Sequence, residues 1–362
     1  MLTVFAVVVG AALPAGASVA QDALPTAQVD GIVYSVAQVG SRTIIGGDFS
    51  AVGGVARRNA AAILPDGKVD PSFDPRPDGT VFAVAGSEDG SRIFLGGTFA
   101  SVGATPRASL AAVDPVSGAA IPGWQADTDE FVYALEVKGT RLYAGGTFRS
   151  IGGAAIRRLA SLDVGTAAVD PTFNPWPDWT VKDIAVAPDG TKVYATGGFT
   201  NIGGQHRVGA AEVLATTGKA TAFDPAEGGV GIALGLTPDG SRFFFSTTNN
   251  RMYAYDPAVS STPAWVVQTS GDTQAIGASA TEVYFGGHFS QLSTYRLKRQ
   301  LLASVRVADG SPTNWAPALS TRSKGMGPWA VAVTPDRVIV GGDFLRVNNK
   351  AQSGVAFFAG TP

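Results

Sequence analysis

The stretch RTIIGGDFSAVGGVARRNAAAILPDGKVDPSFDP, residues 42–75, contains residue types that could bind a phosphate group. Two glycine pairs flank Phe49, and Arg57 and Arg58 follow. Amides of a glycine-rich loop with arginines nearby can hold an anion. A phosphate loop, however, precedes a helix, and no helical periodicity follows these glycines. The glycines therefore favour a structural role, because glycine inside a strand marks a bulge or a close backbone approach.

Basic residues that follow the glycine-rich loops are a second candidate for ligand chemistry. They are Arg58, Arg107, Arg158, Arg207, Arg299 and Lys350. If the loops share one face of the fold, these residues form a ring of cations that could bind an anionic polymer. The alternative is that each arginine clamps a neighbouring aspartate or a backbone carbonyl between blades. Aspartates that recur as partners are Asp48, Asp70, Asp170 and Asp224.

Two tryptophans break the repeating pattern. DPRPDGTV, residues 74–81, becomes NPWPDWTV at residues 174–181, so Trp176 and Trp179 replace an arginine and a glycine. Exposed indoles can stack on sugar rings or anchor a partner protein. The alternative is that they pack against the adjacent repeat. The other tryptophans occupy aromatic positions of the repeat and are expected in the core: Trp124, Trp265, Trp315 and Trp329.

A second departure lies at TTNNRMYAY, residues 247–255, which lacks the glycine-rich loop. Asn249 and Asn250 predict a tight turn instead, since asparagine tolerates positive φ. The shorter loop would leave a notch beside the densest basic stretch of the chain. A groove could then form at Tyr295, Arg296, Lys298 and Arg299, although a solvated loop is the alternative.

Metal, thiol and nucleic-acid chemistry have little support. The chain has no cysteine, a net charge of -2 and a pI near 5.7, which exclude thiolate zinc sites, disulfides and a strongly basic nucleic-acid footprint. Only His206 and His288 are present, without metal-ligand spacing, and His288 is expected to face solvent or a turn. We expect no metal and no cofactor. Calcium at DPSFDP or DPTFNP remains open, and sequence alone cannot pair the carboxylates for acid–base chemistry.

The elements that must position these residues come from an internal repeat. The aromatic residue of the glycine-pair motif recurs about every fifty residues, and one copy is eroded, with Asn249 in its place. The aromatic positions are Phe49, Phe99, Phe148, Phe199, Phe289 and Phe344. The chain therefore contains seven units of about fifty residues.

Each unit predicts four short antiparallel strands. Turns with Asp-Gly separate the strands, and the fourth segment ends on an aromatic residue. Such a repeat is typical of a blade, so the fold predicted is an all-β, seven-bladed β-propeller of four-stranded antiparallel blades. The chain ends after a third strand. We therefore expect residues around Leu24–Val29 to close the last blade, which otherwise runs from about Trp329 to Phe358.

GGDFSAVGGVARRNAAAILPDGKVDPSFDP and IGGAAIRRLASLDVGTAAVDPTFNP resemble the delta-60 repeat of bacterial secreted and surface proteins. The resemblance covers nearly the whole chain after residue 20, and it is weak in the fifth unit. It implies a β-propeller and export, and it carries over no catalytic residues.

Residues 1–20 are apolar and uncharged, with small residues before Ala20, which predicts a secretory signal peptide or a retained anchor. No basic residue precedes the apolar run. The predicted organisation is 1–20 leader and 21–362 propeller, with secreted or cell-surface localisation and no membrane span in the mature chain. The leading hypothesis is a module that binds a glycan or a protein through one loop face. The alternatives are a polysaccharide lyase or hydrolase and a structural subunit of an envelope or adhesive assembly.

Overall fold

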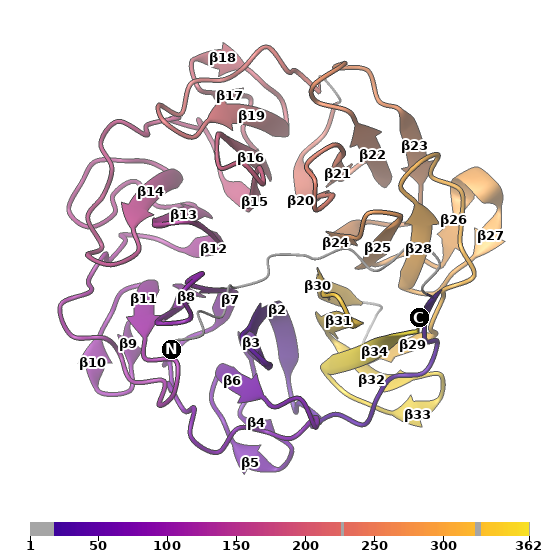
Figure 1. Ribbon diagram of the computed structural model, residues 1–362, viewed down its shortest axis with the longest axis horizontal. Coiled ribbons are helices and arrows are strands. Elements are labelled where there is room, and N and C mark those ends of the chain that lie inside the picture. Colours follow the sequence, from indigo (N-terminus) through magenta and orange to yellow (C-terminus); the bar gives the residue numbers. More distant parts are fainter. Residues whose placement is uncertain (1–17, 226–227, 323–326, 362) are drawn as a thin grey trace, which may run out of the picture.

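The computed structural model describes residues 18–225, 228–322 and 327–361. In this part of the chain, seven antiparallel sheets surround a central axis like the blades of a propeller (Figure 1). The fold predicted from the repeat is confirmed.

Within each blade the strands follow one another outward from the axis, joined by short turns and loops. The innermost strands are β2 (Ile32–Val39), β7 (Val81–Gly86), β12 (Val132–Lys138), β15 (Val181–Val186), β20 (Gly231–Leu236), β24 (Thr273–Ala278) and β30 (Pro328–Val333). The second strands are β3 (Arg42–Asp48), β8 (Ile93–Gly97), β13 (Arg141–Gly146), β16 (Lys192–Gly197), β21 (Phe243–Thr247), β25 (Glu282–Gly287) and β31 (Arg337–Gly342). The third strands are β6 (Ala60–Ile63), β11 (Leu110–Val113), β14 (Leu159–Asp163), β19 (Ala210–Leu214), β22 (Arg251–Tyr255), β28 (Leu302–Arg306) and β34 (Val355–Thr361).

The fourth segment of most blades is shorter than the predicted strand. It is a full strand in the fifth blade, β23 (Trp265–Gln268), and in the last blade. In the other five blades it meets the third strand through a single bridge, at Val69, Ala120, Val169, Ala220 and Pro312. The aromatic that follows is still buried, as predicted, for example Phe73 and Trp124.

The loops between second and third strands form small hairpins at the outer rim (Figure 1). They pair β4 (Ala51–Val52) with β5 (Val55–Ala56), β9 (Ser101–Val102) with β10 (Thr105–Pro106), β17 (Asn201–Ile202) with β18 (Gln205–His206), and β26 (Gln291–Leu292) with β27 (Leu297–Lys298) around the 3-10 turn η1 (Ser293–Tyr295). In the last blade, β32 (Phe344–Val347) lies between β29 (Leu319–Thr321) and β33 (Lys350–Ala351).

An N-terminal strand closes the last blade, as predicted. β1 (Ser18–Val19) pairs with the end of β34, and Leu24 bridges Phe357. The closing strand begins upstream of the predicted Leu24–Val29, because β34 is longer than the other third strands and offers partners as far as Thr361. Residues 1–17 of the predicted leader lie outside the described residues. Ser18 and Val19 belong to it, so the predicted cleavage after Ala20 would remove β1 and leave the Leu24 bridge.

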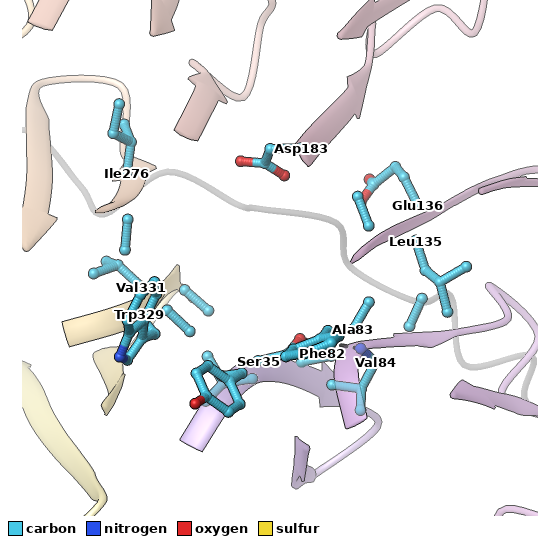
Figure 2. A pocket seen from close by; sticks show the side chains of 18 of the residues that line it. Ser35, Phe82, Ala83, Val84, Leu135, Glu136, Asp183, Ile276, Trp329 and Val331 are labelled. Carbon is cyan, nitrogen blue, oxygen red and sulfur yellow. Dashed lines mark hydrogen bonds between the residues drawn. The ribbon is translucent and has the colours of Figure 1, made fainter. Parts of the chain in front are cut away.

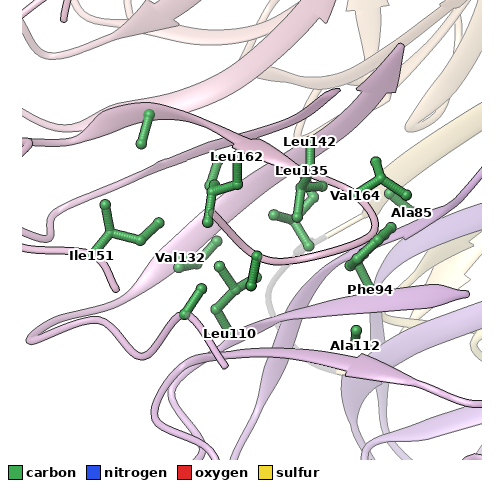
Figure 3. Close-up of a cluster of buried hydrophobic side chains, with 14 of the residues drawn as sticks. Ala85, Phe94, Leu110, Ala112, Val132, Leu135, Leu142, Ile151, Leu162 and Val164 are labelled. Carbon is green, nitrogen blue, oxygen red and sulfur yellow. The ribbon is translucent and has the colours of Figure 1, made fainter. Parts of the chain in front are cut away.

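The hydrophobic core lies between the blades. Figure 3 shows one cluster, in which Phe94 and Leu110 of the second blade meet Val132 and Leu142 of the third. Similar clusters occupy the other junctions, including the one between the last blade and the first, where Ile339 meets Val33.

The glycine pairs of the second strands explain how closely the blades approach. A Cβ on Gly96 would lie 2.7 Å from Val132 of the next blade, and one on Gly341 would lie 2.7 Å from Val33. A Cβ on the second glycine, Gly97, would overlap the carbonyl oxygen of Thr80 in the same blade. The predicted structural role of these glycines is therefore confirmed.

At two junctions both partners of this contact differ. Thr196 replaces the glycine where Gly231 replaces the facing valine, and the threonine hydroxyl donates to the Gly209 carbonyl at 2.7 Å. At the next junction Ser246 donates to the carbonyl of Thr273 at 2.8 Å. The small residue can therefore sit on either blade, provided that the pair stays small.

We expect Gly96→Thr to lower the free energy of unfolding by about 1–3 kcal/mol, because the new side chain overpacks against Val132. Combining it with Val132→Gly reproduces the Thr196–Gly231 arrangement. The double variant should therefore be more stable than the sum of the two single losses predicts, by at least about 0.5 kcal/mol in a double-mutant cycle measured by urea unfolding. Gly228→Thr is the control, since nothing lies within 4 Å of a Cβ there. Strictly additive losses would contradict the proposed contact.

Candidate functional site

A cavity of about 1770 Å³ lies on the propeller axis, and residues of all seven innermost strands line it (Figure 2). Ligand pockets usually enclose about 300–1,000 Å³, so this cavity has room for a ligand larger than a single small molecule. Its lining combines side chains from every blade.

A β-bulge in each innermost strand creates the ring of side chains that gives the cavity its chemistry. The pairing register with the second strand shifts at the same point in every blade, for instance between Val33 and Ser35. A bulge leaves its extra residue outside the ladder and re-aims the side chain. The residues at these positions that line the cavity are Tyr34, Phe82, Tyr133, Lys182, Ile232, Gln274 and Trp329.

Four of these residues form a continuous aromatic arc: Trp329, Tyr34, Phe82 and Tyr133. Successive ring centroids are 5.5, 5.3 and 5.1 Å apart, in tilted or edge-to-face arrangements that aromatic pairs prefer. The rings are partly exposed to the cavity. Phe131, 44% exposed, extends the arc with its ring 6.4 Å from Tyr133. The arc thus offers an apolar wall that is already packed before any ligand binds.

The expectation that Trp329 lies in the core is wrong. Trp124 and Trp315 are buried on outer segments, as predicted, and Trp265 packs against its cluster while partly exposed. Trp329 instead lies at the bulge of an innermost strand and faces the cavity (Figure 2). Within the described residues, its indole Nε1 is buried and has no hydrogen-bond partner.

Two carboxyl groups line the cavity on the side away from Trp329 (Figure 2). Burial, with the nearby carboxylates of Asp183 and Glu88, raises the pKa of Glu136 to about 8, although Lys138 opposes the shift. Burial likewise raises the pKa of Asp183 to about 7, against backbone hydrogen bonds from Leu234 and Ile184. Both side chains are partly open to the cavity, so water there moderates the effect of burial.

Asp183 also has a structural role. Its Oδ2 accepts the amide of Leu234 in the next blade at 2.9 Å. Ser35 holds the equivalent position in the first blade, and its hydroxyl accepts the amide of Val84 at 3.0 Å. Glu136 has no such bond among the described residues, which makes it the freer acid of the pair.

His288 lies near the arc rather than facing bulk solvent or a turn. Its ring centroid is 6.3 Å from that of Trp329, and its Nδ1 is 3.4 Å from the side-chain nitrogen of Gln274. The correction follows from the bulge, because Gln274 and Trp329 are aimed toward the axis beside the second-strand ends.

Most of the predicted basic ring is engaged in holding the backbone. Arg107, Arg207 and Arg299 each donate to carbonyl groups of the fourth segment in their own blade, at Ile121, Thr221 and Thr313. Arg57, which the sequence analysis did not select, donates in the same way to Asp70 and Pro71. These contacts match the alternative in their backbone acceptors, but they lie within each blade and not between blades, as that alternative expected.

The recurring aspartates find different partners. Asp70 and Asp170 pair with arginines at the start of second strands, Arg42 and Arg141, at 2.9 and 2.8 Å. Asp224 pairs with Arg207 at 3.3 Å.

Arg58, Arg158 and Lys350 lie at other positions of their loops. Arg58 donates to the carbonyl of Asp78 and lines a second cavity, of about 670 Å³, whose wall also contains the carboxylates of Asp30, Asp48 and Asp78. Lys350 pairs with Asp22 at 2.9 Å. The structure therefore distributes the basic residues over separate blades and does not bring them together.

Trp176 and Trp179 are exposed, by 46% and 63%. The guanidinium of Arg157 lies 4.4 Å from the ring centroid of Trp176, and that of Arg158 lies 6.0 Å from Trp179. Burial, together with the like charges of Arg149 and Arg157, lowers the pKa of Arg158. The structure thus brings one residue of the basic ring, Arg158, close to Trp179.

The second predicted group does not converge on one point. Tyr295, 38% exposed, donates its hydroxyl to the Gly310 carbonyl at 2.8 Å, and Arg296 caps η1 with a φ of 52°. Lys298 is exposed in β27, and Arg299 is held by Thr313. The tight turn at Asn249–Asn250 is present, with Asn250 at a φ of 60°.

In the described ranges, no three His, Cys, Asp or Glu side chains are grouped as metal ligands would be. The same ranges contain no helix with the length and apolar character needed to cross a membrane.

The aromatic arc was missed by sequence reasoning although a signal for it exists. The first strand of four units carries an aromatic immediately after its first buried residue, in VYSV, VFAV, VYAL and PWAV. Such residues suggest core packing, and only the bulge turns them toward the axis.

Comparisons with known proteins identify the fold and no family. No protein-family model matches the chain, and no curated protein matches it. Among solved structures, U3-55K matches with a TM-score of 0.63 and 10% identity over 96% of this chain and 100% of that chain. The RRP9 WD40 repeats match with a TM-score of 0.62 and 10% identity, covering 97% of this chain and 99% of that one. The WD40 β-propeller domain of Doa1 matches with a TM-score of 0.62 and 12% identity, over 94% and 97%. The chain is therefore a WD40-type β-propeller in fold, and the likeness extends no further.

We expect Glu136→Gln to raise the melting temperature in a pH-dependent way. An unfolded glutamate ionises near pH ~4.3, whereas the folded-state pKa of Glu136 is about 8. Ionisation therefore costs the folded state stability above the unfolded pKa, and the cost levels off above the folded pKa. The increase in melting temperature of Glu136→Gln over the wild type should be near zero at about pH 4 and should grow up to about pH 8. Glu130→Gln, at an exposed position, is the control. A gain that does not change with pH would contradict the raised pKa.

Proposed function

We propose that this protein is a secreted or cell-surface carbohydrate-binding module that holds a saccharide against the aromatic arc of its central cavity. One observation carries the proposal: four adjacent blades place an aromatic ring at the same bulge, although the fold accepts lysine, isoleucine and glutamine at the other three. A position with only a structural role would have no reason to hold aromatic residues in four adjacent blades and other residue types in the remaining three.

The chemistry of the arc suits a sugar. Aromatic faces pack against the C–H faces of a pyranose ring, while polar groups beside them can bond the hydroxyls. Lys182 and Gln274 stand at the same level of the cavity and supply such polar groups. A protein partner is less well suited, because the rings line a concave cavity rather than a protruding or flat surface.

Export and relationship to the delta-60 repeats are parts of the same proposal. The apolar, uncharged segment of residues 1–20 supports export, and the GGDFSAVGG and IGGAAIRR units support the relationship. Both rest on sequence features. Secretion is tested by expressing the full chain in a bacterial host and locating it by fractionation.

The binding proposal is tested with a glycan array, followed by calorimetry with the best neutral saccharide. Phe82→Ala should weaken that binding by about tenfold or more, since loss of a central stacking ring removes a hot spot. Ile232→Ala is the matched control, because Ile232 occupies the equivalent bulge in the fifth blade and is not aromatic. Equal loss in both variants, or no loss in Phe82→Ala, would contradict binding at the arc. Melting temperatures of both variants show whether each has folded.

A second candidate function, polysaccharide cleavage, is favoured by Glu136 and Asp183. A carboxyl group with a raised pKa can remain protonated near neutral pH and act as a general acid, while a neighbouring carboxylate acts as base or nucleophile. If the protein is an enzyme of this kind, it should release new reducing ends from a bound polysaccharide, and Glu136→Gln should abolish the release while leaving binding intact. Release that continues unchanged in Glu136→Gln would assign the activity to other groups.

A further inference from the structure

Trp176, Trp179, Arg157 and Arg158 form an exposed group, here called the rim platform, over the junction of the third and fourth blades. The two tryptophans come from the connection that leads into β15, and the two arginines come from the loop between β13 and β14. The guanidinium carbon of Arg157 lies 4.4 Å from the ring centroid of Trp176, and that of Arg158 lies 6.0 Å from the ring centroid of Trp179. Alternation of aromatic and cationic groups on one surface is suited to a ligand with both apolar faces and negative charge.

The platform is built by paired departures from the repeat. In the first unit Arg76 pairs with Asp74 at 2.6 Å. In the third unit the same two positions hold Trp176 and Asn174, so the ion pair is lost and an indole takes its place. Trp176 keeps the left-handed backbone of Arg76, with a φ of 49° against 53°.

A second pair of changes makes space for the other indole. Trp179 stands where the first unit has Gly79, and Gly198 stands where the second blade has Thr98. A Cβ on Gly198 would lie 2.7 Å from Cδ1 of Trp179. The indole therefore rests on a glycine that replaced a larger residue.

The platform adjoins the cavity. Trp179 directly precedes Thr180, which lines the cavity together with Lys182. Gly198, beneath the indole, is equivalent to Thr147 and Thr248 of neighbouring blades, and both of these line the cavity.

The aromatic arc reaches the same junction. It ends at Tyr133 and Phe131 of the third blade, next to the fourth blade that carries Trp179. Aromatic side chains are thus present both in the cavity, at Tyr133, and on the rim platform, at Trp179.

The charge is mainly positive on the rim part of this path, whereas the carboxyl groups of Glu136 and Asp183 lie at its cavity end. Arg149, Arg157 and Lys182 are exposed, and among the described residues their side chains form no hydrogen bond or salt bridge. Two carboxylates, Glu130 and Asp178, also lie near Arg158. Asp178 is already occupied, since both of its oxygens accept bonds from Thr200 and Asn201. The donors that remain free would pair with carboxylates of a ligand.

We propose that the rim platform and the aromatic arc form one binding track for a polysaccharide rich in uronic acids, with one end of the chain in the cavity and the remainder across Trp179 and Trp176. Planar guanidinium groups match the carboxylate of each uronate, and the indoles stack on the sugar faces between them. This inference rests on the proposed function and adds to it the charge and the length of the ligand.

The test is calorimetry with oligogalacturonates, using the disaccharide and the octasaccharide, beside neutral gluco-oligosaccharides of the same lengths. The wild-type protein should bind the acidic octasaccharide at least about tenfold more tightly than the acidic disaccharide. The double variant Arg157→Ala/Trp176→Ala should lose most of that difference and keep its affinity for the disaccharide. Arg76→Ala, at the position equivalent to Trp176, should bind both as the wild type does.

Several results would overturn the track. An octasaccharide affinity unchanged in the double variant removes the platform from the site. Loss of disaccharide binding in that variant places the short ligand on the platform instead of in the cavity. If the neutral octasaccharide binds as tightly as the acidic one or more tightly, the inference that the ligand is acidic is refuted, while the proposed function stands. If no saccharide binds, whether acidic or neutral, the proposed function and this inference are both overturned.

Discussion

The contact between a glycine of one blade and a valine of the next is the constraint on which the rest of the structure depends. It joins Gly46 to Val81 and Gly96 to Val132, and it closes the ring by joining Gly341 to Val33. Because no Cβ intervenes, each innermost strand lies directly against the preceding blade. Where the glycine is absent, the facing residue has changed as well, as at Thr196 and Gly231. Overpacking at a single junction would displace the strands around the axis, so the facing residue has changed wherever the glycine has. Opposite Gly286, which is kept, Pro328 takes the place of the valine.

The positions at which the cavity can vary lie next to this contact in each innermost strand. The second glycine of each pair abuts the carbonyl just before the bulge, as Gly97 abuts Thr80. The bulge that follows leaves one residue of the innermost strand outside the ladder and turns it toward the axis. Its side chain lies outside the strand pairing. Lysine, glutamine, isoleucine and four aromatic residues therefore occupy equivalent positions without any change in the fold, and ligand chemistry can be altered there at little cost in stability.

The sequence was sufficient to predict the features that recur in every repeat. It was not sufficient to predict the side-chain directions that depend on the bulge and on how the blades are oriented. The glycine motif, the blade count and closure by an N-terminal strand follow from patterns of about fifty residues. The role of the repeating arginine, seen in Arg107 and Arg207, was weighed as one of two alternatives, although its backbone acceptors lie within the blade and not between blades. Trp329 was misplaced because an aromatic in an apolar run is ordinarily core, and only a shift in register turns it inward. The pairing of Glu136 with Asp183 was beyond reach, since the two residues belong to different blades that the repeat alone does not orient.

Aromatic, cationic and acidic departures from the repeat occur together at the junction of the third and fourth blades. Trp176 and Trp179 lie above it, Gly198 makes space for one of them, and Glu136 and Asp183 face the cavity below. Independent drift would scatter such changes over seven equivalent junctions, and drift alone would not produce a glycine beneath a new indole. A symmetric ring offers no preferred place for a single ligand, so a binding site must break the symmetry somewhere. The junction at which aromatic, cationic and acidic departures coincide is where this propeller breaks it.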